Sequence, residues 1–253
     1  MEIIIKNKEQ IDGIRKSCEL AADTLRFLKC SVRDGVSTQK INEIAEEFIR
    51  DHGAIPAPLN YLGFPKAVCT SLNEVICHGI PSNDIVLKDG DIINIDVTTI
   101  LNGYYGDTST MFSVGPVSDE ASNLITVAQD CLSIGICQVK PKNEFYKIGL
   151  SITEYATSRG CSVVHQFCGH GTGIEFHESP QINHFFNSRE SRDNRKMKSG
   201  MIFTIEPMIN QFKAEAVIDK ADGWTARTKD GGLSAQCEHT VLVTEDGVEV
   251  LTK

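Results

Sequence analysis

The chain has 253 residues, 41% of them hydrophobic, which is ordinary for a globular protein with a sizeable core. Its formal net charge of −9 argues against a general nucleic-acid-binding protein, which would carry a basic excess. The nine cysteines form no CxxC pair, and no apolar run is long enough for a signal peptide or a bilayer span. We therefore expect a soluble, cytoplasmic protein with reduced, structural thiols.

The spacing of apolar residues predicts two helices at the start of the chain. Between residues 8 and 29 these residues recur every three or four positions, which is typical of one face of an amphipathic helix. A second helix is expected after Ser37 or Thr38 as its N-cap, and it should stop near Gly53. An ordered, proline-containing loop should follow. It covers residues 54–65, and the strands expected after it cover residues 67–76 and 92–99.

The second half of the chain repeats this order. Helical spacing returns at residues 119–139 and 143–159, and the second of these segments closes at Gly160. The strand-like runs that follow cover residues 162–166, 201–209, 225–229 and 235–243. No break in composition separates the two halves. We therefore predict an α+β fold with internal pseudo-symmetry, in a single domain of residues 1–253.

Four acidic residues stand in segments that should otherwise be buried strand: Asp96, Asp107, Glu206 and Glu238. An ionised carboxylate in such a place loses hydration worth several kcal/mol, unless a cation or a dense shell of hydrogen bonds replaces it. Four such positions indicate a shared explanation.

The first two of these acids can be placed by the geometry of a hairpin. If Asn102 and Gly103 form a two-residue type I′ turn, then Asp107 lies opposite Thr98. Asp96 would then be its diagonal neighbour on the same face, about 7–8 Å away at the backbone, so that both could hold one ion. The alternative is a solvated hairpin whose outward face carries acids. The apolar character of the strand favours the ion.

Histidines are the second group of candidates. His170 lies in the run Cys-Gly-His-Gly-Thr-Gly, His177 follows seven residues on, and His78 stands at a strand end. A lone histidine is more often a satisfied polar residue than a ligand, but glycines that permit close approach favour a site here. Four carboxylates with one imidazole and no thiolate suit Mn²⁺, Fe²⁺, Co²⁺ or Zn²⁺. The four negative charges favour two ions, about 3.5–4 Å apart.

Four motifs contain these residues apart from His78: NIDVTTILNGYYGDTS, CGHGTGIEFHESP, FTIEPM and SAQCEHT. In this order they resemble the type I methionine aminopeptidases in their bacterial form, and the resemblance runs over nearly the whole chain. It implies the pita-bread fold, a pseudo-symmetric antiparallel sheet with helices on its outer face. It also implies a dinuclear metalloaminopeptidase that removes the initiator methionine from nascent proteins when the second residue is small.

The resemblance further implies the roles of the site residues. One ion would be held by Asp96, Asp107 and Glu238, and the other by Asp107, His170, Glu206 and Glu238. A hydroxide between the ions would attack the carbonyl of the N-terminal methionine. His177 would stabilise the charge that develops on this oxygen, Glu206 would shuttle the proton, and His78 would assist the leaving nitrogen.

A methionine pocket and a sodium site are implied as well. The pocket residues would be Tyr61, Phe64, Cys69, His78, Phe176, His177 and Trp224. The sodium site would be formed by Asn73, Val75 and Ser234. Taken alone, each aromatic residue would more often be core than pocket. The chain departs from the family pattern at Pro58, Phe64 and Glu175, and we hypothesise that the Glu175 carboxylate raises the pKa of a neighbouring imidazole.

The segment Asn187–Ser199 has five basic and two acidic side chains, which gives a local charge of +3 on an acidic protein. It is either a solvated surface loop or a contact for ribosomal RNA. We expect a monomer without membrane contact.

Two alternative functions stay open. An Xaa-Pro aminopeptidase could have the same fold, although such relatives usually carry an extra N-terminal domain. A non-catalytic binding protein could keep the fold and lose its metals, but the complete set of ligands argues against it.

Overall fold

The computed structural model describes residues 2–187 and 193–253. The helices in this part of the chain are α1 (Lys8–Leu28), α2 (Thr38–Asp51), α3 (Asp119–Cys137) and α4 (Tyr146–Ser158), with short 3-10 segments at Lys29–Ser31 and Tyr61–Gly63. The four predicted helices are confirmed. Asn7 begins α1 with a capping box in which its side chain and that of Gln10 bond each other's backbone N–H, and Ser37 caps α2 as expected.

The strands are shorter and more numerous than the sequence suggested. They are β1 (Ile55–Pro56), β2 (Cys69–Leu72), β3 (Val75–Cys77), β4 (Ile92–Leu101), β5 (Tyr104–Ser113), β6 (Ser162–Val163), β7 (Gly169–Gly171), β8 (Glu178–Ile182), β9 (Ile202–Ile205), β10 (Met208–Asn210), β11 (Ala216–Ile218), β12 (Ala226–Thr228), β13 (Ser234–Gln236), β14 (Glu238–Val243) and β15 (Val248–Val250). The runs predicted at 67–76, 201–209 and 235–243 are each split into two strands.

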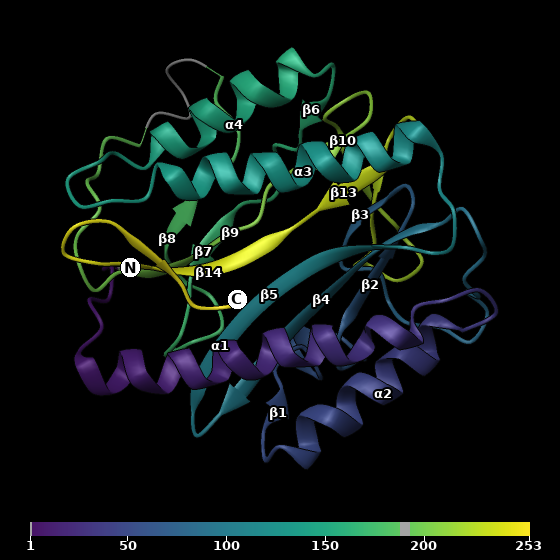
Figure 1. The fold of residues 1–253 in the computed structure, drawn as a ribbon, viewed down its shortest axis with the longest axis horizontal. Helices are drawn as coiled ribbons and strands as arrows, with labels where there is room; N and C mark the ends of the chain where they lie inside the picture. Colours follow the sequence, from purple (N-terminus) through teal and green to yellow (C-terminus); the bar gives the residue numbers. More distant parts are fainter. Residues whose placement is uncertain (1, 188–192) are drawn as a thin grey trace.

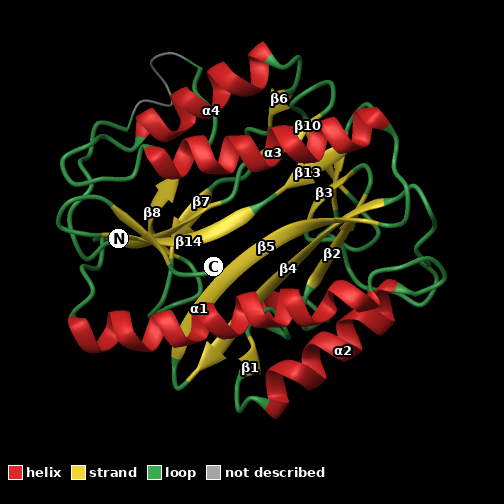
Figure 2. Cartoon of the chain, viewed as in Figure 1, coloured by secondary structure: helices red, strands yellow, loops and turns green. Residues whose placement is uncertain are grey.

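One antiparallel sheet dominates the molecule. Its strand order is β1-β4-β5-β14-β9-β7-β8, and β2 and β15 pair with β4 and β14 off this path. Figure 1 shows α1 and α2 on one side of the molecule and α3 and α4 on the other, with the long strands β4, β5 and β14 between the two pairs. Coloured by structure, the same view shows a curved set of strands framed by four helices (Figure 2). The predicted α+β class with two similar halves is confirmed.

The packing of α1 identifies the outer face of this sheet. Ser17 of α1 donates a hydrogen bond to the backbone carbonyl of Thr99 in β4. Opposite Thr99 stands Gly106, where an added Cβ would lie 2.3 Å from the backbone of Ser17, so this glycine allows the helix to approach. Because side chains alternate along a strand, Thr98 and Asp96 must face the other side.

The β4–β5 hairpin has the predicted register. Asn102 and Gly103 both have positive φ, as a type I′ turn requires, and Thr98 pairs with Asp107. Asp96 and Asp107 therefore share the inner face of the sheet as diagonal neighbours.

Two further expectations can be compared with the structure. All nine cysteines are free. Across residues 2–187 and 193–253, no helix is both long enough and apolar enough to pass through a membrane.

Candidate metal centre and pocket

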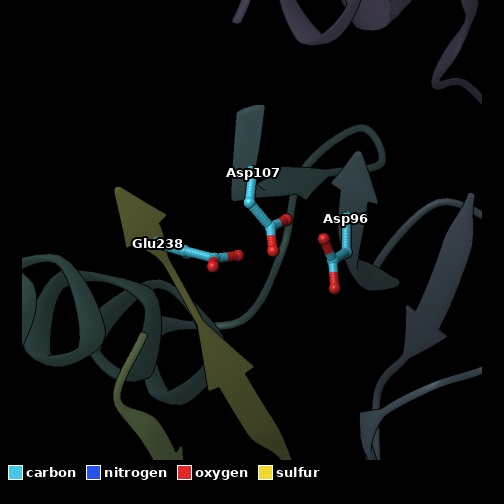
Figure 3. Close-up of side chains that lie close together, drawn as sticks. All are labelled: Asp96, Asp107 and Glu238. Atoms are coloured by element: carbon cyan, nitrogen blue, oxygen red, sulfur yellow. The ribbon is translucent and has the colours of Figure 1, made fainter. Parts of the chain in front are cut away.

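Three carboxylates meet on the inner face of the sheet. Asp96, Asp107 and Glu238 come from the adjacent strands β4, β5 and β14, and one oxygen of each lies within 4.8 Å of the others. Figure 3 shows the three carboxylates pointing toward one another. The register explains this arrangement, since Asp96 and Glu238 both pair with Ser109, one on either side of β5, and Asp107 stands two residues further along.

A histidine and a fourth acid extend this group. His170 Nε2 lies 3.6 Å from Asp107 Oδ2 and also 3.6 Å from Glu206 Oε1. His170 is the middle residue of β7, and the glycines on either side of it allow this strand to pass close to its neighbours. Glu206 was expected inside a strand but lies between β9 and β10. Pro207 follows it and supplies no N–H for a sheet hydrogen bond, which explains the interruption.

The tautomer of His170 follows from its hydrogen bond. Its Nδ1 lies 3.0 Å from the backbone oxygen of Gly171, and a carbonyl oxygen can only accept, so Nδ1 carries the proton. The lone pair of Nε2 then faces two carboxylates. Burial lowers the pKa of His170 to about 4, which keeps the ring neutral. An acceptor that faces acceptors needs a cation between them.

Neighbouring side chains hold the carboxylates in place. Thr98 donates to Asp107 Oδ1 at 2.7 Å, and Thr204 donates to Glu206 Oε1 at 2.7 Å. The carboxamide of Gln236 donates to Glu206 Oε2 at 3.2 Å. Sequence reasoning did not assign these three supporting residues. Their only signal was spacing: Thr98, Thr204 and Gln236 each stand two residues from an acid in the sequence.

The acids are poorly suited to carry their charges without a cation. Burial raises the pKa of Asp107 to about 7. Burial, together with the charge of Asp107, raises the pKa values of Asp96 and Glu238 well above their usual range, and the same causes raise the pKa of Glu206 despite its bond to Thr204. Oxygen donors with one imidazole nitrogen, clustered and turned toward a common point, fit divalent ions well.

A pocket of about 400 Å³ opens above this cluster. Every residue predicted for the methionine pocket lines it, together with the predicted ligands, namely Tyr61, Phe64, Cys69, His78, Asp96, Asp107, His170, Phe176, His177, Glu206, Trp224 and Glu238. Pro58, where the chain departs from the family pattern in the pocket lining, lines it as well. The sequence did not identify six further lining residues: Leu62, Thr98, Gln166, Phe167, Cys168 and Met208. In the sequence, Phe167 and Met208 look like ordinary core residues, because no motif around them indicates a pocket.

Aromatic contacts hold one wall of the pocket together. The rings of His177 and His170 lie 4.2 Å apart between centroids, and Tyr61 packs on Phe176 at 4.7 Å. The Tyr61 hydroxyl lies 2.9 Å from His177 Nδ1. Burial and the nearby His170 lower the pKa of His177, so its ring is neutral.

A second group of contacts in the pocket lining contains His78 and Trp224. Their rings meet edge to face at 6.0 Å, and Phe64 meets the Trp224 ring in the same way. His78 has a positive φ of 57°. The next residue, Gly79, lies against β2, where an added Cβ would be 2.1 Å from the carbonyl oxygen of Thr70, so the chain can turn here only with glycine.

The hypothesis that the Glu175 carboxylate raises the pKa of a neighbouring imidazole is wrong. Burial, and after it the Glu175 charge, raises the pKa of Tyr105, whereas the pKa of His177 is lowered by burial and by its histidine neighbours. The residues proposed for a sodium site do lie together, since the Ser234 backbone N–H donates to the Asn73 carbonyl at 2.9 Å. Val75 follows in β3. Sodium binding itself stays a prediction.

Comparison with known proteins places this site in a family. Residues 12–245 match the profile of metallopeptidase family M24. A methionine aminopeptidase A from Synechocystis is 50% identical over 99% of this chain and 97% of its own length. The methionine aminopeptidase of Escherichia coli is 47% identical over 100% of this chain and 94% of its own.

Solved structures agree. The crystal structure of a methionine aminopeptidase from Rickettsia prowazekii superposes with a TM-score of 0.96 at 46% identity, and each chain is fully covered. A prolidase from Pyrococcus furiosus, with 23% identity and a TM-score of 0.77, shares the fold alone and extends beyond it, since this chain covers 65% of that one. The chain therefore belongs to metallopeptidase family M24, and within it to the methionine aminopeptidases. The predicted pita-bread fold is confirmed by these neighbours.

Proposed function

We propose that this chain is a metal-dependent methionyl aminopeptidase that removes the N-terminal methionine of nascent proteins whose second residue is small. The observation that carries the proposal is one pocket in which clustered buried acids lie below an aromatic wall. Its lining suits a flexible thioether, and its size suits one residue and its neighbour. Full-length similarity to methionine aminopeptidases supports the choice of substrate.

Two ligand sets are proposed for divalent ions. The first contains Asp96, Asp107 and Glu238, and the second contains Asp107, His170, Glu206 and Glu238. When bound, such ions supply Lewis acidity at the scissile carbonyl. The family membership supports a divalent metal, while Co, Mn, Fe and Zn are equally compatible with oxygen and imidazole donors.

The side chains around the ligands perform the remaining tasks. The Tyr61 hydroxyl lies 2.9 Å from His177 Nδ1, and when it donates its hydrogen there the neutral ring carries its own proton on Nε2, from which it can donate toward the oxygen that gains negative charge. Glu206 takes a proton from the attacking water and passes it to the leaving nitrogen, so that the amide bond can break. His78 lines the same pocket, where it orients the scissile amide.

The substrate assignment is tested with tripeptides. Metal-free protein is reconstituted separately with Mn²⁺, Fe²⁺, Co²⁺ or Zn²⁺ and incubated with Met-Ala-Ser, Met-Leu-Ser and Ala-Pro-Ser. Release of methionine from the first peptide alone is expected. Release of alanine from the third would instead favour an Xaa-Pro aminopeptidase, and two bound ions without any cleavage would favour a binding protein.

We also propose that the basic segment contacts the ribosome. Lys196 and Lys198 are exposed, and Lys213 and Lys220 are further exposed cations, whereas Arg227 already pairs with Glu74 at 2.6 Å. Arg189 and Arg192 lie outside the described residues. The variant Lys196→Gln/Lys198→Gln should co-sediment less with ribosomes, most clearly at low salt. Equal retention at every salt concentration would reject the contact.

A further inference from the structure

The segment before α1 reaches the active site through a buried ion pair. Lys6 Nζ bonds the Glu178 carboxylate, and the two residues expose only 4% and 8% of their surface. Burial lowers the pKa of Lys6, while the Glu178 charge opposes this shift. A buried pair of this kind costs desolvation and is weak evidence for stability alone. Its position suggests another role.

Glu178 is bonded to the segment that carries two pocket residues. Its Oε1 accepts the backbone N–H of Ile174 at 2.7 Å and that of Glu175 at 2.9 Å. The next two residues are Phe176 and His177, which line the pocket. Glu178 itself begins β8 and pairs with Gly171, next to His170. The carboxylate thus closes the loop 172–177 from within.

Lys6 is in turn fixed by its backbone. Its N–H donates to the carbonyl of Gly200 at 2.8 Å, and an added Cβ at Gly200 would lie 2.8 Å from Ile5 and 3.1 Å from the Lys6 carbonyl. On the other side of the loop, an added Cβ at Gly173 would lie 2.4 Å from Ile14 of α1. The ammonium group therefore stands on a rigid support.

From these contacts we propose that Lys6 is a positioning residue: through Glu178 it holds the segment 174–177, and with it Phe176 and His177, over the carboxylate cluster. Without the ammonium group the buried carboxylate lacks a counter-charge and must take up water or a proton, either of which loosens its bonds to Ile174 and Glu175. The expected effect on kcat and KM rests on the proposed function, whereas the holding of segment 174–177 rests on backbone geometry alone.

The test compares four variants. K6M leaves Glu178 unpaired. K6M/E178Q removes the charge as well, but its carboxamide oxygen can still accept the two N–H groups. K6M/E178L removes the acceptor. R15M breaks a different ion pair of the N-terminal helix, with Glu249 at 3.0 Å, and leaves the loop alone.

Two readouts separate positioning from a structural role, both taken well below the unfolding temperature. Hydrogen exchange of the amides in residues 174–178 should quicken about tenfold in K6M and K6M/E178L, and stay at the wild-type rate in K6M/E178Q and R15M. In the Mn²⁺-loaded enzyme, kcat for Met-Ala-Ser should fall about tenfold in K6M and K6M/E178L only, because His177 acts on the reacting carbonyl. In the same two variants KM should rise, because Phe176 is displaced.

Three outcomes would overturn the proposal. The amides of K6M could exchange at the wild-type rate, K6M/E178Q and K6M/E178L could lose protection from exchange equally, or folded K6M could keep the wild-type kcat and KM. If K6M fails to fold, the comparison of K6M/E178Q with K6M/E178L still decides whether the acceptor at position 178 holds the loop or the side chain only fills space. If even the wild type releases no methionine, the proposed function fails while the exchange data still test whether Lys6 holds the loop.

Discussion

The two faces of the central sheet differ sharply, although alternate residues of the same strands build both. On the outer face of β4, Ile95 and Val97 are fully buried beside α1 and α2, and Thr99 bonds Ser17. On the inner face, Asp96 belongs to a cluster of acids, and Thr98 donates a hydrogen bond to another member of it, Asp107. On the outer face the hydroxyls of Thr99 and Ser17 find their partners within the fold. The inner face leaves charges that only a cation can balance, so stability and chemistry lie on opposite sides of one sheet.

The largest expected effect is on the inner face, at Asp107. This residue lies between the two ligand groups, near Asp96 and Glu238 on one side and His170 on the other. Asp107→Asn should lower kcat/KM for Met-Ala-Ser by about three orders of magnitude, because a neutral amide is a poor ligand for a divalent ion. Metal content and kinetics check this. Two tightly bound ions and wild-type kinetics in the variant would contradict the shared role.

The matching change on the outer face should act on stability alone. Ile95→Ala removes a fully buried side chain from the cluster beneath α1 and α2, and should lower the free energy of unfolding by about 3 kcal/mol. Urea unfolding measures this loss. At a temperature where the variant is folded, its kcat/KM should equal that of the wild type. A large loss of activity would mean that the two faces are coupled.

The inner face should also set the pH dependence of the metal-free protein. The pKa of Asp107 is raised to about 7 in the folded state, so between pH 5 and pH 7 the folded protein keeps a proton that the unfolded chain has lost. Stability therefore falls as pH rises through this window, by about 2 kcal/mol for this one group, and levels off above it.

Wild type and Asp107→Asn, both freed of metal by a chelator, are compared by urea unfolding at several pH values. The contributions of the other titrating groups largely cancel in the difference between the two proteins. As pH rises to 7, the free energy of unfolding of the wild type should fall relative to that of Asp107→Asn. Addition of the divalent metal should reverse the trend in the wild type, because ions compete with protons for the same oxygens. A constant difference would show that Asp107 titrates normally.

Much of the fold could be predicted because its longest elements are regular. The four helices show clear periodicity, three of them begin with a side-chain N-cap, and the Asn102-Gly103 turn sets the register of β4 and β5. The short strands could not be predicted. The sequence of β7, Gly-His-Gly, has low strand propensity, and its pairing with β9 depends on contacts distant in sequence.

The site was predictable to a similar degree. Acids in apolar strands stand out, so all four carboxylates were found from composition and spacing. Gln236 and His184 were missed because a polar residue carries no mark of a partner that is distant in sequence. Gln236 in β13 bonds the Glu206 carboxylate, and His184, which follows β8, accepts the Glu206 N–H on its Nε2 at 3.1 Å. Such partners become visible only when the chain is folded.

The smallest effect, at two neighbouring threonines, separates the faces most sharply. Thr98 donates to Asp107 at 2.7 Å on the inner face, and Thr99 donates to the Ser17 carbonyl at 2.9 Å on the outer face. Replacement of Thr98 by valine keeps the shape and removes one hydrogen bond, which is worth about 1 kcal/mol. Replacement of Thr99 also removes the contact between its hydroxyl and that of Ser17, but the Ser17 hydroxyl can still donate to the Thr99 carbonyl.

Thr98→Val should therefore lower kcat/KM about fivefold with little loss of stability, because Asp107 is less firmly oriented. Thr99→Val should lower the free energy of unfolding by about 1 kcal/mol and leave kcat/KM unchanged. Kinetics and urea unfolding are measured on both variants. If the two adjacent substitutions changed the same quantity, the sheet would transmit strain between its faces, and the separation of stability from chemistry would not hold at the level of a single residue.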